Sequence, residues 1–445
     1  MQHSPSPLPA LSAPVAGGQA ASSPVQAQPA AQTVHQQFVD WLRQVAPSIH
    51  KFRGQTFVVG IPGEMLLVEN ALNALIHDLS LLHSIGIRVV IVNGCRPQIN
   101  AQLRLRGQAS YYHDGLRITD AVALECAKEA AGEIRYDMEA AFSQGLANTP
   151  MANAGIRVVS GNFTLARPVG IVDGVDFAYS GLVRKVDAAS IRHALDNQQI
   201  VLLSNIGYSA TGEAFNLAME DVAAITAMAL NADKLVFLAE VPGVRGEDGR
   251  IQTEISEAQA RAVLAQPDLE LPLRIYLTAA LKACEGGVAR SHVVPFAVDG
   301  SVLLEFFLHD GVGTMVVRET LEAVREATIE DVSGILALIQ PLEADGTLVK
   351  RDRALIEAEI GNFTVIEHDQ VIFGCAAMYA FAQERMAEMA CLAVNPSVQG
   401  SGDGERLLQR IEQRARAAGI TRLFVLTTRT AHWFLKRGFV MGSVD

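Results

Sequence analysis

Between about residues 55 and 317, short apolar runs alternate with stretches of helical periodicity. The runs are rich in valine, isoleucine and leucine, and loops follow them. Strands covered on both faces of a parallel sheet have continuous apolar runs of this kind. We therefore expect an α/β unit with an open, mostly parallel sheet and helices on both faces. The expected strands are 57–59, 88–92, 157–159, 200–204 and 234–239, and the expected helices are 68–84 and 221–229.

A second pattern begins near residue 327. Thr328 and Asp331 fit a capping arrangement at the start of a helix that includes residues 335–339. Further on, the pattern predicts a partly antiparallel α+β unit. Its expected strands are 363–367, 371–378, 388–394 and 423–427, and its expected helices are 405–418 and 431–436. The first unit would then span 52–318 and the second 327–445, with a linker at 319–326, a charged segment of helical composition.

The start of the chain has a different character. Residues 1–33 are rich in proline, alanine, glutamine and serine and carry almost no charge, which predicts a disordered tail. A helix should follow at 34–51, because Phe38, Trp41, Leu42 and Val45 recur at helical spacing. We expect Thr33 to cap this helix and Pro47 to limit its far end. Its aromatic stripe would pack on its own domain or dock on another subunit.

Composition excludes several classes of protein. With 445 residues and 49% hydrophobic residues, the chain can form two or three domains with sizeable cores. Its net charge of -12 argues against nucleic acid or an anionic membrane as a partner. No run of about 18 uncharged apolar residues predicts a membrane span. The five cysteines form no C-x-x-C pair, which fits a reduced cytoplasm and argues against structural zinc.

The segment 388–406 carries the clearest chemistry. An expected strand is followed by a loop with Gln399, Gly402 and Gly404 and then by a helix. Glycines let backbone N–H groups turn toward an anion, and the start of a helix adds a positive dipole end. The arrangement predicts an anion site, and the alternative is a glycine-rich surface turn.

The second unit resembles the GNAT acetyltransferases over most of its length, at this strand and loop. In that family, the loop amides hold the pyrophosphate of acetyl-CoA. The strand splays from its neighbour, and its backbone holds the pantetheine arm and polarises the thioester carbonyl. The resemblance implies that the cosubstrate acetyl-CoA contacts Cys391, Leu392, Ala393, Val394, Gln399, Gly400, Gly402, Gly404 and Glu405. It implies no metal.

Acetyl transfer to an amine needs a base, because an ammonium group is not nucleophilic. Glu388 is the candidate base, and the alternative is a solvated carboxylate at the strand edge. Thr427 or Thr428 could position a proton for the departing thiolate. Cys391 is expected to line the pocket of the thioester and the acceptor. A nucleophilic Cys391 is the alternative, but the family transfers the acetyl group directly.

The first unit resembles the amino acid kinase family, most closely N-acetylglutamate kinases. The matching segments are 218–221, 240–244, 285–292, 304–305 and 311–314. The chain departs from that family where phosphate would bind. Gly60 stands at the place of a lysine, the loop 93–96 replaces a run of glycines, and Met219 and Glu220 replace an Asn-Ala-Asp turn. Phosphoryl transfer depends on positioned charge, so these departures argue against kinase activity.

A kinase-like unit joined to an acetyltransferase unit resembles the bacterial N-acetylglutamate synthases. The resemblance implies transfer of acetyl from acetyl-CoA to L-glutamate, which starts arginine biosynthesis, and feedback inhibition by L-arginine. It implies an arginine site at His292, Glu305 and Gly311, with glutamate bound by Arg351 and Cys391. It also implies a homohexamer joined through the helix at 34–51.

Two alternatives stay open. Residues 350–353 could instead form a solvated charged turn, and Glu305 and Gly311 could be a locally satisfied carboxylate beside a turn. The sequence ends at Asp445, before the place of a last strand that carries further glutamate contacts in that family. We therefore also keep the alternative of an arginine-binding regulatory protein with a weak or silent acetyltransferase domain.

Overall fold

The computed structural model describes residues 29–145, 147–246, 248–308, 311–317, 323–368, 371–396, 402–427 and 430–442. The chain divides into two compact parts: residues 1–53, whose helix α1 spans Pro29–Phe52, and residues 54–445, which contain both of the units expected from the sequence. The helix begins inside the segment expected to be disordered, so the expectation of a cap at Thr33 is wrong. It also continues through Pro47, because a proline removes one backbone donor and can kink a helix without ending it.

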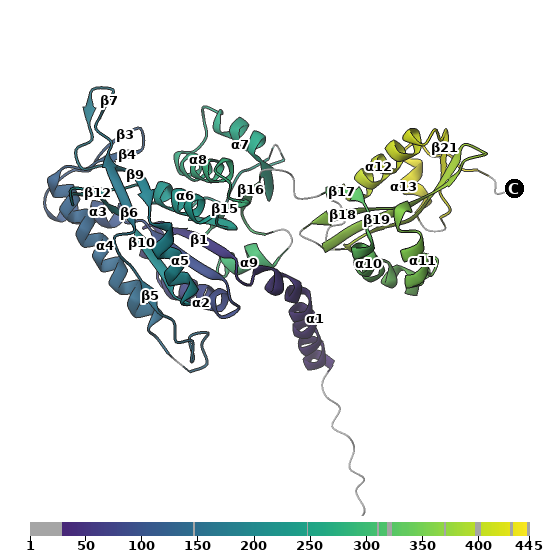
Figure 1. The fold of residues 1–445 in the computed structure, drawn as a ribbon, viewed down its shortest axis with the longest axis horizontal. Helices are drawn as coiled ribbons and strands as arrows, with labels where there is room; N and C mark the ends of the chain where they lie inside the picture. Colours follow the sequence, from purple (N-terminus) through teal and green to yellow (C-terminus); the bar gives the residue numbers. More distant parts are fainter. Residues whose placement is uncertain are drawn as a thin grey trace, which may run out of the picture. The chain divides into compact units, whose positions relative to one another are not determined.

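The expected α/β unit is present, and its sheet has eight strands (Figure 1). In sheet order they are β14 (Glu254–Ser256), β16 (Thr314–Val317), β15 (Arg290–Pro295), β13 (Lys234–Ala239), β1 (Thr56–Ile61), β2 (Arg88–Asn93), β10 (Ile200–Ser204) and β5 (Val158–Val159). The β15–β16 pair is antiparallel, and the other pairs of neighbours are parallel. The prediction of a mostly parallel sheet is confirmed.

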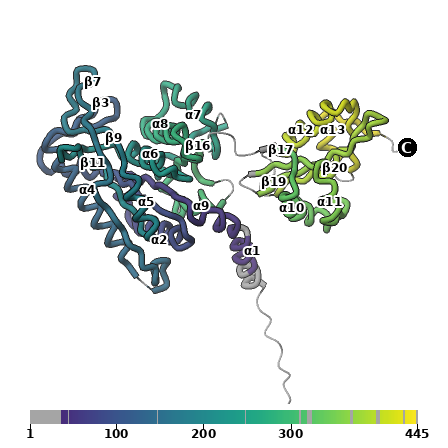
Figure 2. The backbone as a smooth tube through the Cα atoms, in the orientation of Figure 1, coloured from purple at the N-terminus to yellow at the C-terminus, as the bar shows by residue number. Residues whose placement is uncertain are grey.

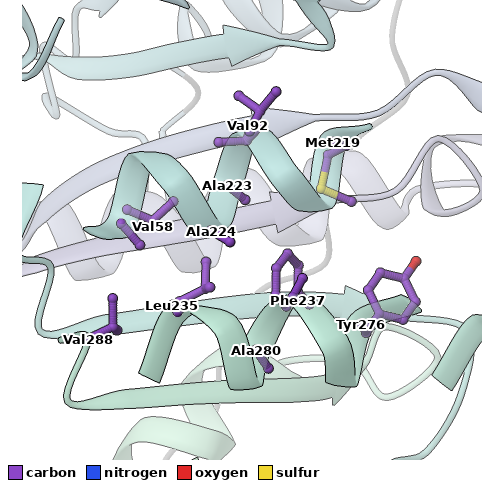
Figure 3. Close-up of a cluster of buried hydrophobic side chains, with 14 of the residues drawn as sticks. Val58, Val92, Met219, Ala223, Ala224, Leu235, Phe237, Tyr276, Ala280 and Val288 are labelled. Atoms are coloured by element: carbon purple, nitrogen blue, oxygen red, sulfur yellow. The ribbon is translucent and has the colours of Figure 1, made fainter. Parts of the chain in front are cut away.

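Helices cover both faces of this sheet (Figure 1 and Figure 2). The contacts of α6 (Met219–Leu230) and α8 (Leu271–Glu285) with β1, β13 and each other place them on one face. The side chains of Val58, Leu235 and Phe237 point toward these two helices (Figure 3). The remaining helices of the unit are α2 (Ala71–Ser84), α3 (Arg96–Leu105), α4 (Ala121–Phe142), α5 (Ala188–Asp196), α7 (Glu257–Leu264) and α9 (Ser301–Phe307).

Short strands that the sequence pattern did not predict extend this unit. A four-stranded sheet has the order β12 (Ala214–Asn216), β11 (Ile206–Tyr208), β6 (Thr164–Pro168) and β9 (Gly181–Val186). Two hairpins are formed by β3 (Tyr111–His113) with β4 (Leu116–Ile118) and by β7 (Ile171–Val172) with β8 (Val175–Asp176). Strands of two to six residues carry too few positions for their alternation to stand out.

The acetyltransferase-like unit is built on a five-stranded sheet. Its order is β17 (Ala323–Glu326), β18 (Phe363–His368), β19 (Val371–Phe381), β20 (Met386–Val394) and β21 (Arg422–Phe424). Figure 2 shows α10 (Val332–Ala344) and α11 (Arg353–Ala358) on one side of this sheet and α12 (Asp403–Ala417) and α13 (Ala431–Leu435) on the other. Each side has its own buried cluster.

The first strand of this sheet corrects the expected linker. Ala323–Glu326 pair with β18 in an antiparallel ladder instead of continuing a charged linker of helical composition. Four residues are too few for a stable helix, and the ladder provides their backbone hydrogen bonds. The expected cap is confirmed, because Thr328 and Asp331 form a capping box. Among the helices that the structure describes, none combines the length and apolar character that a membrane crossing requires.

Candidate active site and effector site

A β-bulge interrupts strand β20 at its functional segment. Ala390 lies opposite Ala377 on β19, and Ala393 lies opposite Cys375, so β20 contains one extra residue between these pairs. Cys391 has a φ of 54°, in the left-handed region that a non-glycine residue rarely adopts. A bulge of this kind changes which side chains face each side of a sheet. Cys391 and Ala393 consequently belong to the cluster on the α10 side.

Strands β20 and β21 separate from each other after a short ladder. Their parallel pairing runs from Met386 to Glu388 on β20 and from Arg422 to Phe424 on β21. Beyond Glu388, the described residues provide β20 with a ladder to β19 alone. This opening agrees with the expected splay. One edge of residues 389–394 can therefore offer backbone groups to an extended ligand.

Helix α12 begins at Asp403, nine residues after the end of β20. Gly402 precedes it with a φ of 97°, and the helix end carries a partial positive charge. A Cβ on Gly404 would lie 3.1 Å from the Trp433 ring, so this turn packs closely against α13. The Glu405 carboxylate accepts a hydrogen bond from Arg437, so this side chain is already paired. The predicted contacts Gln399 and Gly400 lie outside the described residues.

Three of the predicted site residues come together on the α10 side of the sheet. Arg351 lies in the loop before α11, and its backbone N–H donates to Glu343 Oε1 at 2.8 Å. Burial alone would lower the pKa of its guanidinium, but Cys391, Tyr379 and Glu388 lie close enough to raise that pKa overall. Half-buried Glu388 lies directly opposite Tyr379 in the ladder. The structure thus joins a carboxylate, a thiol and a guanidinium beside the strand opening.

The two cysteines of this unit are buried next to each other. The Cys375 thiol donates a hydrogen bond to the Cys391 carbonyl oxygen at 3.5 Å. The neighbouring Cys375 thiol, and then the charge of Arg351, lower the pKa of the Cys391 thiol against the effect of burial. A lowered thiol pKa is one requirement of a nucleophile, so the alternative role of Cys391 needs an experiment.

Thr427 has a local partner. Its hydroxyl lies 2.8 Å from the Thr430 hydroxyl and accepts the Thr430 N–H at 3.1 Å. Strand β21 ends at Phe424, three residues earlier than expected, so Thr427 lies in the segment before α13. No described contact joins Thr427 to Glu388, and the role of Thr427 stays a prediction. Thr428, the alternative, is outside the described residues.

The three residues of the expected arginine site are neighbours in the kinase-like unit. His292 Nδ1 lies 2.7 Å from Glu305 Oε1, and both side chains are buried. Glu305 Oε2 accepts the N–H groups of Val312 at 2.8 Å and Gly313 at 3.1 Å. Gly311 has a φ of 57°, and a Cβ there would lie 2.6 Å from Glu305 Oε2. The hydrogen-bonding capacity of the Glu305 carboxylate is therefore partly used by the backbone of Val312 and Gly313.

His292 has an unpaired nitrogen. Burial first, and then the charge of Lys234, lower the pKa of its imidazole to about 4, so the ring is neutral at pH 7. The ionised Glu305 carboxylate only accepts hydrogen bonds, so the ring proton must reside on Nδ1. Nε2 is then an acceptor, and among the described residues it has no hydrogen-bond partner. A buried acceptor of this kind can receive an N–H group of a ligand.

Side chains close the space at Gly60, where the kinases have a lysine. A Cβ on Gly60 would lie 2.8 Å from the Phe237 ring and 2.9 Å from the Met219 sulfur. A lysine has no room at this position without rearrangement of both neighbours. Met219 and Phe237 belong to the apolar cluster in Figure 3. The packing gives a physical reason for the predicted lack of kinase activity.

A cavity remains beside these residues. Its volume is about 210 Å³, and Arg96, Arg117, Asn205 and Glu220 are among its lining residues. Arg96 lies 3.8 Å from the buried Glu220 carboxylate, whose pKa is raised by burial. The positive charge of Arg96 is therefore partly neutralised by Glu220 inside the cavity.

Sequence reasoning missed three residues of the acetyltransferase-like site. Glu343 and Tyr379 lie next to Arg351, and Glu359 accepts a hydrogen bond from Tyr379. Glu343 is on helix α10, Tyr379 is on strand β19, and Glu359 follows helix α11. No local motif joins them. The one signal was the alternation of β19, which places Tyr379 on the same face as Cys375.

Comparison with known proteins agrees with this two-unit organisation. Residues 55–295 match the model of the amino acid kinase family, and residues 359–441 match that of the acetyltransferase (GNAT) domain. A Ralstonia nicotianae protein named amino-acid acetyltransferase is 60% identical over 410 residues, which cover 92% of this chain and 91% of that protein. A Pseudomonas fluorescens protein of the same name is 50% identical over 409 residues, with coverages of 92% and 94%.

Solved structures resemble both units together. The crystal structure of N-acetylglutamate synthase from Neisseria gonorrhoeae, complexed with coenzyme A and L-arginine, is similar with a TM-score of 0.83 and 39% identity. The similarity covers 91% of this chain and 94% of that one. A second structure of the synthase from the same organism, complexed with coenzyme A and N-acetyl-glutamate, has a TM-score of 0.61 and 40% identity, with coverages of 91% and 93%.

Proposed function

This chain belongs to the amino-acid acetyltransferase family, and we propose that it transfers acetyl from acetyl-CoA to L-glutamate under inhibition by L-arginine. The products are N-acetyl-L-glutamate and CoA. The observation that carries the proposal is the grouping of Glu388, Cys391 and Arg351 beside the opening between β20 and β21. This grouping supplies a base, a pocket wall and a cation for a carboxylate on one face of the sheet.

In the proposed reaction, Glu388 removes a proton from the α-ammonium group of glutamate, directly or through a water molecule. The amine then attacks the thioester carbonyl, and the new oxyanion accepts hydrogen bonds from backbone N–H groups of β20. Collapse of the tetrahedral intermediate breaks the C–S bond and releases the CoA thiolate. The attacking nitrogen gives up its second proton to the thiolate, with Thr427 as the proposed positioning group, and Glu388 releases the first proton to water. The transfer is direct, without an acetylated Cys391.

Acetyl-CoA is the cosubstrate. The end of the β20–β21 ladder at Glu388 supports a role of residues 391–394 in holding the pantetheine arm, because it leaves one edge of β20 open. Gly402 and Gly404, at the start of α12, would bring backbone N–H groups to the pyrophosphate. In this proposal Glu405 contributes its position in the first turn, since Arg437 already pairs with its carboxylate.

Arginine inhibition would act at His292, Glu305 and Gly311. A guanidinium can donate to the unpaired His292 Nε2 and to the remaining lone pair of Glu305. Backbone oxygens near Gly311 would accept its other N–H groups. We further propose a cytoplasmic homohexamer joined through α1. Its arginine response would require coupling between the arginine site and the acetyltransferase site.

The decisive experiment measures CoA thiol release with and without L-glutamate for the wild-type chain and for Glu388→Gln. Loss of a general base lowers kcat by about 10² to 10⁴, and the KM for acetyl-CoA should stay within about twofold. The control is Glu384→Gln, which removes an exposed carboxylate from the turn between β19 and β20.

Absence of glutamate-dependent thiol release from the wild-type chain would reject the proposed activity. If L-arginine still raised its melting temperature, the alternative of a regulatory protein with a silent acetyltransferase domain would be favoured. Equal turnover by wild type and Glu388→Gln would reject Glu388 as the base.

A further inference from the structure

Arg351 lies in the loop between α10 and α11, and hydrogen bonds to both helices hold this loop. Glu343, on α10, accepts the Arg351 backbone N–H at 2.8 Å. Asp352, the next residue, caps α11 by accepting the Leu355 N–H at 2.8 Å. These contacts fix the backbone of Arg351 but leave the direction of its long side chain open. A guanidinium at the end of a flexible chain needs its own contacts to be positioned.

The side chain of Arg351 has such contacts in Tyr379 and Val349. Its Nη1 donates to the Val349 carbonyl oxygen at 3.1 Å. The guanidinium also lies close enough to the hydroxyl of Tyr379 on β19 for the two groups to shift each other's pKa. That hydroxyl in turn donates to Glu359 Oε2 at 2.8 Å. Since the Tyr379 proton is directed to Glu359, the hydroxyl oxygen presents a lone pair to Arg351.

The charged groups on the two sides of Tyr379 determine which way its hydroxyl proton points. Burial and the hydrogen bond to Glu359 raise the pKa of Tyr379 to about 12, while Arg351 opposes the shift. The phenol therefore stays protonated at physiological pH, donates its proton to Glu359 and leaves an oxygen lone pair for Arg351. Glu359 ends α11, and Arg351 lies just before that helix begins. Tyr379 thus connects both ends of a short helix to the central sheet.

The place of Tyr379 in the ladder links this chain to the reaction. Tyr379 lies directly opposite Glu388, so both side chains project from the same face of the sheet. Tyr379 also packs against the cluster that contains Cys391 and Ala393. The group that holds the guanidinium is therefore adjacent to the proposed base. An acceptor amino acid that presents its amine to Glu388 brings a carboxylate within reach of the same region.

We propose that Tyr379, oriented by Glu359, positions the Arg351 guanidinium to receive a carboxylate of the acceptor amino acid. This inference rests on the proposed function and names a further specificity-determining residue for it. Tyr379 acts through Arg351 and has no part in proton transfer. Its loss should weaken acceptor binding without slowing the chemical step of bound substrate.

The test compares four chains: wild type, Tyr379→Phe, Arg351→Lys and the double variant. Tyr379→Phe keeps the ring and removes the hydroxyl, so the packing of β19 is preserved. The KM for L-glutamate should rise about tenfold, because the guanidinium loses the polar oxygen that faces it. Both kcat and the KM for acetyl-CoA should stay within about twofold. In the Arg351→Lys background, the same change should have little further effect, as expected for residues that act as a unit.

Controls separate this role from a general effect on the fold. Glu357→Gln removes a charge from α11 that pairs with Arg353 at 2.6 Å, and its KM for glutamate should equal that of wild type. Glu359→Gln keeps an acceptor for the Tyr379 hydroxyl and should raise this KM less than Tyr379→Phe does.

Several outcomes would overturn the inference. An unchanged KM for glutamate would show that Arg351 does not need Tyr379. A loss confined to kcat would indicate proton transfer instead of positioning, and full additivity with Arg351→Lys would indicate a merely structural role. If wild type has no turnover, the proposed function fails, and calorimetry of glutamate binding in the presence of CoA tests the inference on the same four chains. Tyr379→Phe should then weaken that binding about tenfold, and equal binding would reject the inference.

Discussion

Glu305→Gln should abolish most of the arginine response by changing the tautomer of its neighbour. In the wild type, the carboxylate accepts the proton of His292 Nδ1, which leaves Nε2 as a buried acceptor. In the variant, the glutamine oxygen can still accept the N–H groups of Val312 and Gly313. Its NH₂ group then faces Nδ1 and requires the proton of the neutral ring to move to Nε2. A ring that donates at Nε2 cannot accept a guanidinium N–H group.

The magnitude follows from the lost contact. A hydrogen bond that involves a charged group contributes about 1.5–3 kcal/mol, and each 1.4 kcal/mol is a factor of about ten in affinity. The arginine concentration for half-inhibition should therefore rise at least about tenfold. The stability should change little, because glutamine can maintain all three contacts of Glu305. Glu305→Ala differs, because it leaves three buried polar groups unpaired at about 1–3 kcal/mol each.

The assay is an arginine titration of glutamate-dependent CoA release, with a thermal unfolding curve of each variant. Glu285→Gln is the matched control, because Glu285 is exposed at the end of α8 and pairs with Arg261 at 2.6 Å. The variant Glu305→Gln should keep the wild-type turnover without arginine. Wild-type sensitivity to arginine in a well-folded Glu305→Gln chain would refute the tautomer argument. Equal loss of turnover and sensitivity would show that Glu305 is structural.

Three further predictions concern packing, mechanism and pH. Gly60→Lys should lower the melting temperature by several degrees, since overpacking against Phe237 and Met219 costs about 1–3 kcal/mol. This variant should show no ATP-dependent phosphorylation of N-acetylglutamate, and detectable phosphorylation would contradict the packing argument. Cys391→Ala should lower kcat by less than about tenfold, whereas a loss of about 10³ or more would indicate a nucleophile. The pKa of His292 is about 4 in the folded chain and near 6.5 in the unfolded chain, so protonation favours the unfolded chain. The contribution of neutral His292 to the free energy of unfolding is therefore fully present above pH 6.5 and is lost as the pH falls toward 4. Between pH 7 and 5, urea unfolding of the wild type should therefore lose about 2 kcal/mol more than that of His292→Asn, and equal losses would contradict the assignment.

Periodicity predicted the buried strands well. The ranges 200–204 and 234–239 coincide with β10 and β13, because a strand covered on both faces is apolar at every position. It failed where long-range pairing decides the structure. Ala323–Glu326 have a helical composition, yet pairing with β18 makes them a strand. Helix α1 likewise runs past Pro47, where a local rule placed its end.

Site residues in the arginine region could be anticipated from family resemblance, but their electrostatic state could not. The sequence suggested that Glu305 pairs with a guanidinium. The fold also directs two backbone N–H groups and His292 to its carboxylate, and the pairing with a guanidinium stays a prediction. The unpaired acceptor is consequently on His292, and it arises from burial and from a tautomer that a partner 13 residues away determines. No pattern of residue types along the chain encodes that state.

The arrangement of the acetyltransferase site depends on the β-bulge in β20, which the sequence pattern does not predict. In a regular strand, Glu388 and Cys391 would project from opposite faces, since they are three residues apart. They share a face because the bulge after Ala390 adds one residue to β20. Bulges that use the left-handed region often place glycine there, but this chain has Cys391 at a φ of 54°. The ladder with β19 and the packing against α10 must hold this conformation, and they thereby bring Glu388, Cys391 and Arg351 together on one side of the sheet.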